Sequence, residues 1–328
     1  MRPADKFLRL GTIVSGELFL TAVLLISFLC RIGTYSLFST ENSYTFAGIS
    51  FGLTPAGSCI AGFICSVAAG LILIGIDRVH TIIRARSMAP AALFLLLITC
   101  TPQLYPLSRG LAATPFLLLA TYCLMSSFQK ESSQINLFHT FLLLGTGSLV
   151  YPKLTWLAPL FLVGAVIFMS LNIRSFFAAI LGWALPFWIL FAIAILSQDL
   201  SMLYAPFREL IHFQALGTNY PAWQLLLLAL LLIAWIASIL NKISTKYDDK
   251  MRTRTFLNFL SLLSIALLLG TVLQPSDGAD MLPLACAPVG LLMGHHFTLA
   301  NNKGDSAFIL FVLLALVTVY FVNVWMIL

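Results

Sequence analysis

Apolar runs of close to twenty residues follow one another along almost the whole chain. A transmembrane helix needs about 20 apolar residues to cross roughly 30 Å of hydrocarbon, and helices satisfy their own backbone groups in lipid. Charges, prolines and glycine turns divide the sequence into eleven such runs: 10–30, 56–76, 88–107, 110–128, 137–151, 154–172, 175–197, 223–240, 255–273, 282–300 and 307–327. The sequence therefore predicts an all-α polytopic transmembrane bundle of ten or eleven spans, in a single domain over residues 1–328.

The composition supports a lipid environment. Of the 328 residues, 60% are hydrophobic and 9% are charged, against about 25% charged in ordinary soluble domains. The formal net charge of +6 does not indicate nucleic acid, because the basic residues lie scattered at the ends of apolar runs and form no stripe with interleaved aromatic residues. Membrane lipids are the expected partners.

The basic residues also predict an orientation. With the N-terminus in the cytoplasm and alternating spans, fourteen of the eighteen Lys and Arg residues fall inside. The four outside are Arg31, Arg109, Lys153 and Arg208, while the acidic residues divide almost evenly between the two sides. This bias is the one expected for a multi-pass protein of the bacterial inner membrane.

One acid lies inside an apolar run. Glu17 falls in the first predicted span, where a charged carboxylate costs about 2.5–3.5 kcal/mol on insertion scales. We therefore expect Glu17 to face the bundle, as a proton or ion relay or as a neutral carboxyl hydrogen-bonded between helices.

The predicted outer face gathers the residue types that a phosphate site needs. Arg and Lys bind phosphate oxygens, and a carboxylate can accept a proton from a hydroxyl. The candidate phosphate-binding residues are Arg31, Arg109, Lys153, Arg208 and His212, the last two on an amphipathic helix predicted in "LSMLYAPFRELIHF". The candidate base is Glu41 in the first outer loop. The alternative is that the cations reach lipid headgroups and that acids such as Asp277 and Asp280 in "QPSDGAD" cap loops.

No motif of a soluble enzyme occurs. The six cysteines fall inside apolar runs without metal-ligand spacing, so we interpret them as packing residues. We expect no metal site and no cofactor.

The middle of the chain carries a resemblance. "RGLAATPFLLLATYCLMSSFQKE" and the following "NLFHTFLLLGTGSLVYPKLTWLAPLFLVGAVIFMSLNIRSFFAAILGWALPFWI" resemble a bacterial family of multi-pass inner-membrane proteins, a domain of unknown function. In architecture only, the chain is similar to integral-membrane glycosyltransferases that use polyprenyl-phosphate sugars. Those enzymes carry an acidic motif early after the first span, whereas Glu41 comes ten residues after Arg31.

Three functions remain open from the sequence. The chain could act on a lipid- or isoprenoid-phosphate-linked substrate at the extracytoplasmic face, in glycosyl transfer or cell-envelope assembly. It could be a transporter or flippase using Glu17 and the short hairpin over residues 137–172. It could also be a structural membrane subunit without catalysis.

Overall fold

Each apolar run of the sequence forms helix in the computed structural model, which describes residues 11–34, 42–46, 49–130, 132–198, 201–211, 220–244, 250–300 and 303–327. The helices are α2 (Glu17–Thr34), α3 (Pro55–His80), α4 (Ala89–Thr99), α5 (Arg109–Ser126), α6 (Gln134–Val150), α7 (Ala158–Ile167), α8 (Ile173–Leu196), α9 (Ser201–Ile211), α10 (Ala222–Ser244), α11 (Met251–Leu273), α12 (Gly278–Thr298) and α13 (Lys303–Ile327). The short 3-10 helices are η2 (Pro102–Leu104), η3 (Pro152–Leu157) and η4 (Pro275–Asp277).

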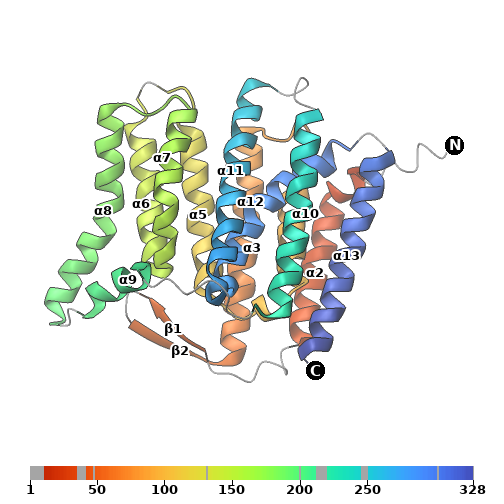
Figure 1. The fold of residues 1–328 in the computed structure, drawn as a ribbon, viewed down its shortest axis with the longest axis horizontal. Helices are drawn as coiled ribbons and strands as arrows, with labels where there is room; N and C mark the ends of the chain where they lie inside the picture. The colour runs from red at the N-terminus through yellow and green to blue at the C-terminus, as the bar shows by residue number, and fades with distance from the viewer. Residues whose placement is uncertain are drawn as a thin grey trace.

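The long helices stand side by side as a bundle (Figure 1). A two-stranded hairpin and the short helix α9 lie at one end of this bundle, which we call the hairpin end. Within the described part of the chain, seven helices are long and apolar enough to cross a membrane: α2, α3, α5, α8, α10, α11 and α13. Large apolar side chains are exposed on several of them, including Leu18, Ile173, Leu196 and Trp325 at 78% or more. Such a surface is stable in lipid and unstable in water.

Helix α12 is the core of the bundle. Every residue from Met281 to Phe297 is buried, and the helix packs against α4, α5, α10 and α11. Small residues permit this close packing, since a Cβ at Gly294 would lie 2.6 Å from a side-chain atom of Pro90 in α4. A helix with protein on all sides needs no lipid-facing surface of large apolar side chains, which explains the Gly, Ala, Cys and Pro in "LACAPVGLLMG".

Prolines and hydroxyl caps fix where helices begin. Each of the three 3-10 helices starts with a proline, which has no N–H to leave unpaired at a first position. Thr54 caps α3 by accepting a hydrogen bond from the Gly57 N–H at 3.2 Å. Asn172 and Ser175 form a capping box at the start of α8, the pattern that satisfies free N–H groups reciprocally.

The first predicted outer loop contains β structure, which the sequence analysis did not anticipate. Strands β1 (Asn42–Phe46) and β2 (Ile49–Leu53) pair antiparallel, with Asn42 opposite Leu53 and Phe46 opposite Ile49. Aromatic and β-branched residues in "NSYTF" and "ISFGL" favour strands. Apart from this hairpin, the fold of the described residues is all-α, as predicted.

The prediction that Glu17 faces the bundle is wrong. Residues 11–14 form a separate helical turn, the chain turns at Ser15 and Gly16, and α2 begins at Glu17. Glu17 is exposed. A carboxylate in the first turn of a helix interacts favourably with the helix dipole, so this position accommodates an acid without a buried partner.

Candidate functional site

Five charged side chains meet at the hairpin end. Arg109 begins α5, Lys153 lies in η3, Glu209 in α9, Asp277 at the end of η4 and Asp280 in the first turn of α12. We call these five residues the hairpin-end cluster. Segments far apart in the sequence therefore converge on one charged site.

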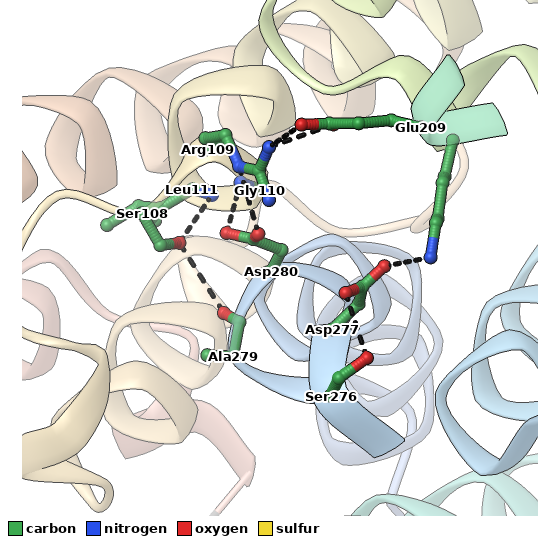
Figure 2. A network of polar contacts seen from close by, with 10 residues as sticks. Ser108, Arg109, Gly110, Leu111, Glu209, Ser276, Asp277, Ala279 and Asp280 are labelled. Atoms are coloured by element: carbon green, nitrogen blue, oxygen red, sulfur yellow. Dashed lines mark hydrogen bonds and ion pairs between the residues drawn. The ribbon is translucent and has the colours of Figure 1, made fainter. Parts of the chain in front are cut away.

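Arg109 joins two carboxylates (Figure 2). Its Nη1 donates to both oxygens of Glu209 at 2.9 Å, and its Nε lies 3.4 Å from Oδ2 of Asp280. The other oxygen of Asp280 accepts a hydrogen bond from the Gly110 N–H at 3.1 Å. The guanidinium thus ties α9 to the start of α12.

Lys153 forms the second half of the cluster. Its Nζ contacts Oδ2 of Asp277 and Oε1 of Gln274, and it lies 5.7 Å from the ring centre of Trp156. Only 8% of the Lys153 side chain is exposed. A buried ammonium needs such a partner, because an unpaired charge in a low-dielectric environment is strongly unfavourable.

The backbone at the start of α5 brings the two halves together. Ser108 caps the helix by accepting a hydrogen bond from the Leu111 N–H at 3.0 Å, and its hydroxyl lies 3.4 Å from the carbonyl of Ala279. A Cβ at Gly110 would lie 1.6 Å from the carbonyl oxygen of Asp280. Only glycine permits this approach of α5 to α12.

Charge and exposure differ across the cluster. Two cations face three carboxylates, and the exposed side-chain fraction rises from 13% at Asp280 and 17% at Asp277 to 46% at Glu209. Both cations contact carboxylates, so an incoming anion would compete with these carboxylates for Arg109 and Lys153. Glu209 is the carboxylate most open to displacement.

An apolar cavity of about 110 Å³ adjoins Lys153. Tyr151 and Lys153 line it together with apolar side chains of α7, α11 and α12, such as Leu160, Ala266 and Leu284. Tyr151 is 2% exposed, and its hydroxyl has no hydrogen-bond partner in the described part of the chain. The cluster thus combines charged groups with an apolar space that extends into the bundle.

The structure brings together two of the predicted phosphate-binding residues, Arg109 and Lys153, and separates Arg31 from them. Arg31 is 5% exposed and donates to the carbonyls of Cys59 and Tyr105, at 3.3 and 2.9 Å, and to the Ser66 hydroxyl at 3.1 Å. These bonds join α2 to α3 and to the segment after η2. Arg31 is therefore a helix-packing residue in this structure and lies outside the cluster.

The remaining predicted site residues do not join the hairpin-end cluster in the described part of the structure. Arg208 is exposed on α9, beside Glu209. Glu41 and His212 lie outside the described residues. Glu17 lines a pocket of about 730 Å³ with Arg78 and Arg86, where α3 ends and α4 begins.

Sequence reasoning did not select the three carboxylates of the cluster. The available signal was an acidic pair three residues apart in "SDGAD", just ahead of a helix whose small residues indicate a central position. Among the described residues, no group of three or more His, Cys, Asp or Glu side chains is placed to hold a metal ion.

A family model described as "Family of unknown function (DUF6427)" matches residues 58–328 of the chain. No curated protein matches the chain, and no solved structure matches it. The matched region contains α5, η3, α9, η4 and α12, and therefore the whole hairpin-end cluster.

Proposed function

We propose that this chain, which belongs to the DUF6427 family, acts on a lipid- or isoprenoid-phosphate-linked substrate at the hairpin end of its bundle. The observation that carries the proposal is the position of the cluster. Of the two cations suited to a phosphate, Lys153 lines the apolar cavity and contacts Asp277, and Arg109 contacts Glu209 of α9. Charged groups next to an apolar space match a substrate with a phosphate at one end of a hydrocarbon chain.

The charge balance suggests how such a substrate binds. Its phosphate would replace Glu209 on Arg109, because Glu209 is the most exposed carboxylate of the cluster. The released Glu209 could then accept the proton of an acceptor hydroxyl. In a glycosyl transfer, the acceptor oxygen bonds the sugar carbon while the carbon–phosphate oxygen bond breaks, and the lipid phosphate leaves with that electron pair.

We further infer that the bundle crosses the bacterial inner membrane eleven times, with its N-terminus in the cytoplasm and the hairpin end outside. The support is the correspondence between the eleven apolar runs and helical segments that alternate in direction between the ends of the bundle. Reporter fusions within residues 245–249 and within residues 35–41 test this orientation. We expect cytoplasmic signals from the first fusion and periplasmic signals from the second, and the reverse pattern would refute it.

Binding measurements on the purified protein test the proposed substrate. In detergent, undecaprenyl phosphate and undecaprenol are titrated while the tryptophan fluorescence is recorded. We expect the phosphate to bind more tightly than the alcohol, and R109Q to lose this preference.

The decisive variant is E209Q, which removes the carboxylate that competes with phosphate for Arg109. We expect E209Q to bind undecaprenyl phosphate more tightly than the wild type and to lose any transfer activity. The matched control is E17Q, at the opposite end of the bundle, which should bind as the wild type does. Equal binding of the alcohol and the phosphate, or no gain in E209Q, would refute the proposal and favour a structural role.

A further inference from the structure

The end of the bundle opposite the hairpin contains a second charged pocket, of different character. It has a volume of about 680 Å³ and is lined by the end of α3, the end of α5 with the chain that follows it, and the start of α11. The lining residues are Val79, His80, Ser126, Phe128, Gln129, Lys130, Met251 and Arg252. Among these described residues, none is acidic.

Arg252 is held in place by neutral groups. Its guanidinium carbon lies 5.9 Å from the ring centre of Phe128 and 5.2 Å from that of Phe256. Its Nη2 lies 3.4 Å from Nδ1 of His80, which makes that nitrogen the acceptor. Among the described residues that line the pocket, no carboxylate accompanies the charge of Arg252.

His80, at the end of α3, is the buried partner of Arg252 in this pocket. His80 is 2% exposed, and the centre of its ring lies 5.1 Å from the centre of the Tyr122 ring. Its Nε2 lies 3.5 Å from the Ser126 hydroxyl. These contacts fix the orientation of the imidazole, whose Nδ1 lies next to Arg252.

Lys130 adds a second cation to the pocket wall. It is exposed and follows Gln129, whose left-handed φ of 53° turns the chain at the end of α5. The Gln129 N–H donates to the carbonyl of Phe168 at 3.0 Å, which anchors this turn. Two cations and a histidine thus converge on one pocket, whereas each cation of the hairpin-end cluster contacts a carboxylate.

We propose that this pocket binds the phosphate group of an anionic ligand. Arg and Lys together suit a phosphate, which offers several charged oxygens to a planar guanidinium. The first turn of α11 has no side-chain cap, so its N–H groups and positive dipole end favour the same charge. Such a phosphate can belong to the headgroup of a phospholipid or to a soluble phosphate ester. The same cations would bind the phosphate oxygens of either ligand.

Two measurements on the full-length protein in neutral detergent separate the sources. Native mass spectrometry compares the binding of phosphatidylglycerol with that of phosphatidylcholine, and calorimetry measures the binding of glycerol 3-phosphate. Selective binding of phosphatidylglycerol identifies a lipid headgroup site, and binding of glycerol 3-phosphate identifies a site for a soluble ester. If neither ligand binds selectively, the proposal is wrong.

The variant that tests the residues is R252Q, with R174Q as its matched control. Arg174 is an exposed arginine at the start of α8, outside the pocket. Losing a charge-assisted hydrogen bond should weaken phosphate binding about tenfold or more in R252Q, and R252K should retain part of it. An equal loss in R174Q would overturn the assignment. R109Q should leave this binding unchanged, so the result is independent of the proposed function.

Discussion

Replacing Arg109 should destabilise the bundle far more than replacing Glu209, although the two side chains contact each other. The Glu209 side chain is 46% exposed, and exposed ion pairs contribute about 0.2–1 kcal/mol. Asp280 is 13% exposed, and breaking a buried pair by removing one partner costs about 3–5 kcal/mol. We therefore expect E209Q to cost under about 1 kcal/mol and R109Q to cost about 3 kcal/mol or more.

The double variant makes this reasoning sharper. R109Q leaves the Asp280 carboxylate with only the Gly110 N–H, whereas R109Q/D280N leaves no charge unpaired at that position. The double variant should therefore be more stable than R109Q alone. Two independent destabilising substitutions would instead add, and the double variant would be the less stable of the two.

Thermal unfolding followed with a thiol-reactive fluorogenic dye provides the assay, because Cys59, Cys100 and Cys286 are free and buried. At about 2–4 °C per kcal/mol, R109Q should lower Tm by roughly 6 °C or more. Equal shifts for R109Q and E209Q, or a double variant less stable than R109Q, would refute the burial argument.

Four further substitutions probe the packing, each read by the same unfolding assay. G62A should destabilise the protein by about 1–3 kcal/mol, because its Cβ would lie 2.3 Å from the Tyr105 carbonyl oxygen. G75A should instead stabilise α3 by about 0.5–1 kcal/mol, because its Cβ would have nothing within 4 Å. Equal effects of G62A and G75A on Tm would contradict this. R31Q should cost about 2–3 kcal/mol because buried carbonyls lose their donor, and an unchanged Tm would contradict it. Y151F should leave stability unchanged or higher, since the buried Tyr151 hydroxyl has no hydrogen-bond partner among the described residues, and a clear loss would contradict this expectation.

The helices were predictable because length and apolar character alone decide them in lipid. Which helices pack against one another was not predictable, because lipid and protein offer similar apolar contacts. Both α12 and α13 are apolar runs in the sequence, yet α12 is surrounded by protein and α13 exposes Phe321 and Trp325. Only the small residues of α12 hinted at this difference.

The cluster was predictable in part. Arg109 and Lys153 were selected because each lies at the end of a predicted span, and the structure brings them to one site. Their partners are Glu209, 100 residues from Arg109, and Asp277, more than 120 residues from Lys153. Pairing over such separations depends on helix packing, which a single sequence does not reveal. Glu17 was misplaced because the predicted span over residues 10–30 runs through the turn at Ser15 and Gly16.

The two ends of the bundle should respond differently to salt. In the binding mode proposed for the hairpin end, an anion would replace Glu209 on Arg109, so the number of ion contacts would change little on binding. In the opposite pocket a phosphate adds to cations that no described carboxylate neutralises. Exposed charge pairs weaken as the Debye length shortens from about 10 Å at 0.1 M salt to about 3 Å at 1 M. Binding of glycerol 3-phosphate or phosphatidylglycerol should therefore weaken steeply between these concentrations, while binding of undecaprenyl phosphate should change less. A salt dependence that is equal at both ends would contradict the distinction between exchange and addition, because both sites would then bind phosphate by the same gain of charge contacts.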